Sequence, residues 1–88
     1  MGGETETTRR TKRVISSWAD IDQQKITLDT KLSRLRTDHL DELRRDMNAE
    51  FEDEGAFPIT PGEWEDADPK TVRDVRDLAD KKLSEVTA

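Results

Sequence analysis

His39 has the side chain in this chain best suited to proton transfer or metal binding, and acidic residues flank it. It is the only histidine, and it stands among Asp38, Asp41 and Glu42. An imidazole in this setting could act as a general acid or base, or bind a metal, if a cleft and an orienting partner held it. The sequence supplies neither, so we expect an exposed polar residue with no catalytic role and no metal.

The remaining residue patterns point away from catalysis as well. The acidic run Glu50, Glu52, Asp53 and Glu54 lacks the fixed spacing around a turn glycine that a hard-cation loop needs. Cysteine is absent, which excludes a thiolate nucleophile and a thiolate zinc site. No glycine-rich phosphate loop or nucleophile elbow occurs. We therefore predict that the protein is not an enzyme.

Size and charge restrict the partners of the chain. With 88 residues and a net charge of -6, it has the size of one domain, and its surface repels nucleic acid. A basic cluster, Arg9 to Arg13, could contact phosphate, but no aromatic residues interleave with it, so a solvated helix face is favoured. No apolar run reaches the length of a membrane span. We expect a cytoplasmic monomer that binds neither nucleic acid nor membrane.

Helical spacing of apolar residues predicts the elements that position these groups. Residues 1–6 read as a flexible tail, followed by a helix from Thr7 to about Asp20. The apolar residues of segment 21–37 keep neither helical nor strand spacing, which predicts a long anchored loop with one helical turn at 33–35. The face of the first helix predicted to be buried consists of Thr11, Val14, Ile15, Trp18 and Ala19.

The second half of the chain predicts three more helices. Asp38 is suited to cap a helix that ends at 52–55, and Thr60-Pro61 and Asp68-Pro69 repeat the start signal for a short helix and a last helix ending near Thr87. Trp18 is assigned to the core, while Trp64 could be core or interface. The apolar positions expected to face the core are Leu40, Leu43, Met47, Phe51, Phe57, Ile59, Val72, Val75, Leu78, Ala79 and Leu83. The fold class is therefore all-α.

Residues 25–80 resemble acyl carrier proteins in the order and spacing of several short motifs. Leu35 to Leu40 reads LRTDHL where that family has leucine-glycine-any-aspartate-serine-leucine. The other matching pieces are the end of the first helix at Val14–Asp22, ITLDTKL at Ile26–Leu32, Met47, FPI at Phe57–Ile59 and TVRDV at Thr71–Val75. The resemblance implies a four-helix bundle over residues 7–86, with a long first loop and a short third helix.

The resemblance also implies where a cofactor would be attached, and the chain departs from the family there. The family joins phosphopantetheine to a serine at the position of His39, and an imidazole cannot form that phosphodiester. Arg36 replaces a glycine, and Arg45 and Asp46 stand where carriers usually have apolar residues. We therefore expect no cofactor at this position.

These departures leave three hypotheses open. The first is a non-enzymatic module that binds a protein, such as an enzyme of acyl or aminoacyl metabolism, through Asp38, His39, Leu40, Asp41, Arg44 and Arg45. The second is a working acyl or aminoacyl carrier that is modified at Thr37 or Ser33. The third is an engineered loss of the serine, against which the other substituted positions argue.

Overall fold

The computed structural model describes residues 5–54 and 58–87, and side chains within 5–54 and 58–85. In these residues the chain forms the helices α1 (Glu6–Ala19), α2 (Leu32–Leu35), α3 (Leu40–Glu50), α4 (Pro61–Ala67) and α5 (Val72–Thr87), with 3-10 turns η1 (Gln23–Lys25) and η2 (Glu52–Glu54). Within these ranges there is no strand, only an isolated bridge between Lys31 and Thr71. The prediction of an all-α chain is confirmed.

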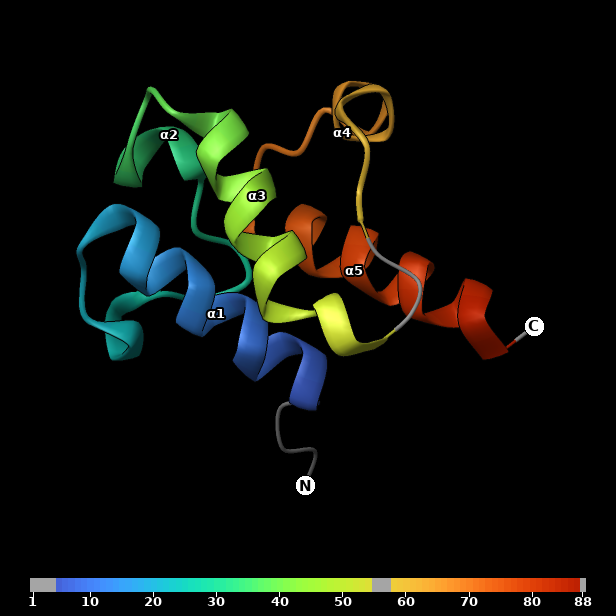
Figure 1. The fold of residues 1–88 in the computed structure, drawn as a ribbon. Helices are drawn as coiled ribbons and strands as arrows, with labels where there is room; N and C mark the ends of the chain where they lie inside the picture. Colours follow the sequence, from blue (N-terminus) through green and yellow to red (C-terminus); the bar gives the residue numbers. More distant parts are fainter. Residues whose placement is uncertain (1–4, 55–57, 88) are drawn as a thin grey trace.

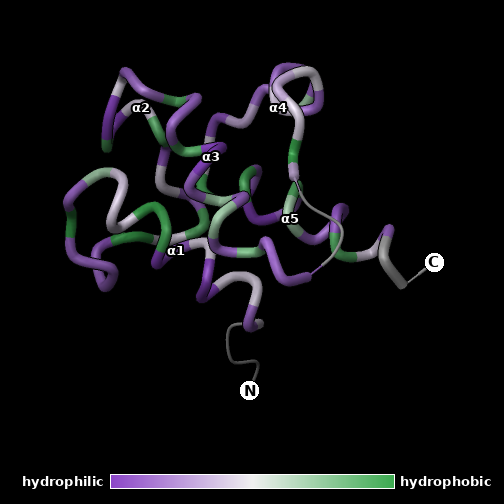
Figure 2. Tube along the Cα trace, in the orientation of Figure 1, coloured by the Kyte–Doolittle hydropathy of each residue, from purple (hydrophilic) through white to green (hydrophobic). Residues whose placement is uncertain are grey.

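Helix α1 runs from the bottom centre to the left of the view in Figure 1, and α3 and α5 pack against it. Helix α4 contacts α3, and the loop from η1 to α2 runs past α1 to the start of α5 before it reaches α2 (Figure 1). Along the main helices, apolar and polar positions alternate as amphipathic packing requires (Figure 2). The buried core consists of Val14, Ile15, Trp18, Ile26, Leu32, Leu43, Met47, Phe51, Ile59, Trp64, Val72, Val75, Leu78 and Ala79.

Helix α1 matches the predicted pattern closely. It begins at Glu6, one residue earlier than expected, because the Thr5 hydroxyl accepts a hydrogen bond from the Thr8 amide and caps the helix. Thr5 and Glu6 therefore do not belong to a tail, and residues 1–4 lie outside the described part. The predicted inward face is buried apart from Ala19, which is half-buried, and Trp18 is a core residue as expected.

The long loop before α3 is anchored to the start of α5. The Leu32 amide donates to the Lys70 carbonyl (2.9 Å), and the Val72 amide donates to the Thr30 carbonyl (3.0 Å). Ile26 and Leu32 are buried, so the loop also contributes to the core. The helical turn expected at 33–35 is present as α2, one residue longer, while the η1 turn was not predicted.

Two expectations about α3 are wrong. The residue that caps the helix is His39 rather than Asp38, and its side chain makes no capping hydrogen bond. Leu40 was expected to face the core but is 39% exposed, because the core-facing stripe begins one turn later at Leu43. The helix ends at Glu50, slightly earlier than predicted, with Phe51 as its C-cap.

The start of α4 is as predicted, and the start of α5 is not. The Thr60 hydroxyl and the Glu63 carboxylate form a reciprocal capping box around Pro61. Asp68 does not cap α5, because it is the left-handed C-cap of α4, with φ of 45°. Instead, α5 begins where Thr71 and Asp74 exchange hydrogen bonds between side chain and backbone amide.

The segment between α3 and α4 is held to α3 by a side-chain amide. Asn48 accepts from the Ile59 amide (2.7 Å) and donates to the Ile59 carbonyl (3.1 Å), which places the Ile59 side chain in the core as predicted. Trp64, for which core and interface were both open, is buried. Phe57 lies outside the described residues.

The contact between α4 and α5 predicts an acid-sensitive contribution to stability. Glu63 accepts two hydrogen bonds from the buried Lys82 ammonium (2.8 and 3.0 Å) and one from the Thr60 amide. These bonds, that from Lys82 foremost, lower the pKa of Glu63 from 4.5 to about 2. Since the folded pKa lies below the unfolded one, this stabilisation is present above about pH 4.5 and is lost as the pH falls toward about 2.

Urea unfolding measured between neutral pH and pH 2 tests this contribution. We expect the free energy of unfolding of the native protein to fall by about 1–2 kcal/mol more than that of a Glu63→Gln variant, a figure reduced for the partial exposure of Glu63. Glu65→Gln, one residue away and exposed, is the matched control and should retain the pH dependence of the native protein. The prediction would be contradicted if the free energy of unfolding changed with pH equally in the native protein and in Glu63→Gln.

Candidate functional site

The backbone at His39 has a conformation that ordinary residues rarely adopt. Its φ is 59° and its ψ is 32°, in the left-handed region that disfavours side chains with a Cβ by about 1–2 kcal/mol. The His39 carbonyl accepts from the Trp18 indole Nε1 (2.9 Å) and from the Glu42 amide (3.0 Å). A buried tryptophan of α1 therefore fixes the backbone where α3 begins.

Arg36 also links the segment before α3 to the end of α1. Its Nη1 donates to the Trp18 carbonyl (2.8 Å), and its Nε donates to the Asp38 carboxylate (3.1 Å). Its guanidinium carbon also lies 5.7 Å from the centre of the Trp18 ring, within reach of a cation-π interaction. Arg36, which the sequence marked only as a departure from a family pattern, thus ties the end of α1 to the start of α3.

The His39 side chain projects outward between two carboxylates. It is 54% exposed, with Nε2 at 3.4 Å from Asp38 Oδ2 and Nδ1 at 3.7 Å from Glu42 Oε2. Within residues 5–54 and 58–87, no three histidine or acidic side chains lie close enough to hold a metal ion. The imidazole is therefore exposed, and so are the two carboxylates beside it.

Of the six residues predicted to bind a partner, the structure separates one from the others. Arg44 is only 12% exposed, because its guanidinium donates to Asp41 (3.0 Å) and to the Ile59 carbonyl (3.1 Å). It secures α3 to the segment before α4. The other five residues are exposed, and Arg45 pairs with Asp41 one turn before it. We call this set the partner face: Asp38, His39, Leu40, Asp41 and Arg45.

The two charged residues that depart from the carrier pattern within α3 differ in their surroundings. Arg45 is exposed and pairs with Asp41 (3.1 Å), one turn away. Asp46 is half-buried, and burial is the main cause of its raised pKa, with a further increase from Glu42 and an opposing effect of Arg36. A half-buried carboxylate makes this flank of α3 unsuited to lining an apolar pocket.

A groove that the sequence did not predict opens beside the partner face. It has a volume of about 400 Å³ and lies where α2 and the start of α3 meet the loop before α5. We call it the Leu40 groove. Its lining comprises Lys31, Leu32, Ser33, Arg36, Thr37, Leu40, Asp68, Pro69 and Lys70. Both hydroxyls considered for attachment of an arm, Ser33 and Thr37, therefore lie in this groove.

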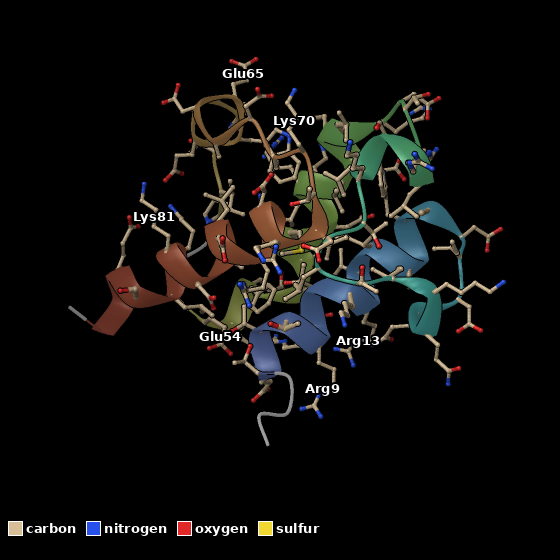
Figure 3. All side chains as sticks on the ribbon, turned by 180° about the vertical axis from the view of Figure 1, so that it is seen from behind. Arg9, Arg13, Glu54, Glu65, Lys70 and Lys81 are labelled. Atoms are coloured by element: carbon tan, nitrogen blue, oxygen red, sulfur yellow. The ribbon has the colours of Figure 1, made fainter. Side chains whose placement is uncertain are left out.

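The basic and acidic clusters noted in the sequence are partners of each other. Arg10 Nε and Arg13 Nη2 both donate to Glu50 Oε2 (2.8 and 2.7 Å), and Arg10 Nη2 donates to the Glu50 carbonyl (2.6 Å). Arg10 also pairs with Glu54 (3.4 Å), which Figure 3 shows beside the start of α1. Part of the basic cluster thus joins α1 to the end of α3 instead of forming a free phosphate-binding surface.

The geometry describes a helix start that presents polar groups and a leucine to solvent. The Trp18 indole donates to the His39 carbonyl and Arg36 donates to the Trp18 carbonyl, so hydrogen bonds to α1 hold the backbone at residues 36–39. Within the described ranges, none of the helices has the length and apolar character to cross a bilayer. Comparisons of the chain with protein-family models, curated proteins and solved structures give no match.

Proposed function

We propose that this protein is a non-enzymatic, acyl-carrier-like helical module that binds a protein partner through the partner face. The observation that carries the proposal is the fixed, exposed start of α3. There His39, Leu40 and Asp41 project from a backbone that Trp18 holds from within the core. A surface whose backbone is already ordered loses little conformational entropy on binding.

The order of elements supports the resemblance to carrier domains. A long helix, a long anchored loop, a helix beginning at residue 40, a short helix and a last long helix follow one another. The position equivalent to the family's attachment serine lies at the beginning of α3 and faces solvent. A histidine at that position supports partner binding without an arm, and enzymes that handle acyl or aminoacyl groups are the natural partner class.

The first experiment is the intact mass of the protein after incubation with coenzyme A and a broad-specificity phosphopantetheinyl transferase. We expect the native chain to keep its mass, because an imidazole does not accept the arm as a phosphodiester. We expect a His39→Ser variant to gain the mass of one arm, because the transferase recognises the surface around the start of α3. His39→Ala, which has no hydroxyl, is the matched control and should stay unmodified.

The remaining outcomes are decisive. A His39→Ser variant that stays folded by circular dichroism but unmodified would remove the carrier resemblance from the proposal. An arm on the native chain would support the second hypothesis instead. The exposure of Ser33 and Thr37 keeps that hypothesis open, and peptide mapping together with Ser33→Ala and Thr37→Val variants would locate the modified residue.

A further inference from the structure

The Leu40 groove differs in charge from the rest of this acidic protein. Three cationic side chains, Lys31, Arg36 and Lys70, line it, against one lining carboxylate, that of Asp68. Its lining therefore has a net charge of +2 within a chain of net charge -6. Figure 3 places Lys70 at the end of the bundle where the loop before α5 approaches α2.

Ion pairs within the protein do not neutralise these cations completely. Lys70 pairs with Asp68 (3.1 Å), but both side chains are more than two-thirds exposed, and such a pair is weak in water. Arg36 pairs with the exposed Asp38 (3.1 Å), which does not line the groove. Lys31 is exposed and forms no ion pair with any residue in the described ranges.

The groove also has apolar lining. Leu40 is the one large hydrophobic side chain that is exposed among the described residues, and Leu32 and Pro69 line the groove beside it. The groove thus combines apolar lining with a few charged groups, as binding pockets commonly do. At about 400 Å³, the groove has room for one or two side chains of a peptide.

We propose that the Leu40 groove docks a segment of a partner protein in which carboxylates flank one apolar side chain. The apolar side chain lies against Leu40 and Pro69, while the carboxylates pair with Lys31 and Lys70. The local positive charge selects an acidic segment over a basic one, because opposite potentials across an interface give specificity. This inference rests on the proposed function for its location, since Leu40 belongs to both the partner face and the groove.

A peptide titration followed by ¹⁵N-¹H NMR of the full chain tests the proposal. The probe is a capped pentapeptide with one leucine at its centre and two glutamates on each side. We expect saturable shifts confined to the amides of residues 31–40, Asp68 and Lys70. Two comparison peptides, one with lysines for the glutamates and one with glycine for the leucine, should give no saturable shifts there.

Charge reversal locates the binding site. A Lys31→Glu, Lys70→Glu variant should bind the acidic peptide at least about tenfold more weakly, because both proposed pairs become repulsive. Both lysines are exposed, so the variant should keep the fold, which its NMR spectrum checks. Lys25→Glu with Lys81→Glu is the matched control, with the same charge change at exposed sites outside the groove.

Each contrary result overturns the inference without affecting the transferase experiment. Absence of shifts, or shifts spread equally over Arg9 and Lys25, would mean that the groove is not a docking site. Equal binding of the glycine peptide would mean that the apolar side chain is not recognised. Shifts of the same amides on concentrating the protein alone would identify a second copy of the chain as the occupant. Loading of His39→Ser together with a failed titration would refute this inference only.

Discussion

Replacing Phe51 by alanine is expected to destabilise the protein by about 3–5 kcal/mol, the usual effect of truncating a fully buried phenylalanine. Phe51 is completely buried where α1 meets the end of α3, and the Arg10 guanidinium lies 4.2 Å from the centre of its ring. A chain of this length has a total stability of roughly 4–13 kcal/mol. The single substitution therefore removes a large part of it, which urea unfolding measures.

Leu40→Ala is the matched control, because it truncates another apolar side chain in the same part of the sequence. Leu40 is exposed, so its truncation should change the free energy of unfolding by no more than about 0.5 kcal/mol. A comparable loss in the two variants would place Leu40 in the core, as the apolar spacing of the sequence suggested. A small loss for Phe51→Ala would contradict its burial.

The residues that sequence patterns located correctly are those governed by local rules. The buried face of α1 follows from helical spacing, and the start of α4 follows from the capping pattern of Thr60, Pro61 and Glu63. In these cases the determining contacts lie within one or two helical turns. Sequence spacing alone therefore contains the information that fixes them.

The errors occur where a distant contact decides the local structure. Asp38 is a good cap by type, but bonds from Trp18 and Arg36 set the backbone there and leave His39 as the N-cap in a left-handed conformation. Asp68 precedes a proline as Thr60 does, but it ends α4 in a left-handed conformation instead of starting α5. The chain between them is paired with residues 30–32, and α5 starts at Thr71, where Thr71 and Asp74 exchange hydrogen bonds.

The sequence predicted only the part of the candidate site that depends on neighbouring residues. His39, Leu40 and Asp41 are adjacent in sequence, so an exposed start of α3 could be anticipated. The Leu40 groove could not, because pairing of residues 30–32 with 70–72 brings Lys31 and Lys70 together. Arg44 has the charge expected of an interface residue, but its guanidinium donates to the Ile59 carbonyl and is therefore mostly buried.

Arg10 is the second residue whose replacement should lower the free energy of unfolding strongly. It joins α1 to α3 because it bonds to both the side chain and the backbone of Glu50. Its guanidinium bonds to the Glu50 carboxylate and carbonyl, and the two side chains are only 17% and 19% exposed. Hydrogen bonds to charged groups contribute about 1.5–3 kcal/mol each. We expect Arg10→Met, which keeps the apolar stem, to destabilise the protein by about 2–3 kcal/mol, since Arg13 still contacts Glu50.

The same variant should change the response of the protein to acid. Burial raises the pKa of Glu50, but hydrogen bonds from Arg10 and Arg13 outweigh it, so the pKa lies below the ordinary 4.5. The stabilisation is therefore present above about pH 4.5 and is lost as the pH falls through the lowered value. The difference in unfolding free energy between the native protein and Arg10→Met should thus narrow in acid, once Glu50 is protonated in both.

Arg9→Met provides the matched control for Arg10→Met. Arg9 is exposed and forms no ion pair with residues 5–54 or 58–85, so its loss should change stability by no more than about 0.5 kcal/mol at any pH. A double-mutant cycle with Glu50→Gln then isolates the pair of side chains, and a coupling energy near zero would show that Arg10 acts through its other contacts, with Phe51, Glu54 and the Glu50 carbonyl. A coupling that disappears in acid would assign the stabilisation to the ionised Glu50, and hence to the junction that aligns α3 and its exposed start against α1.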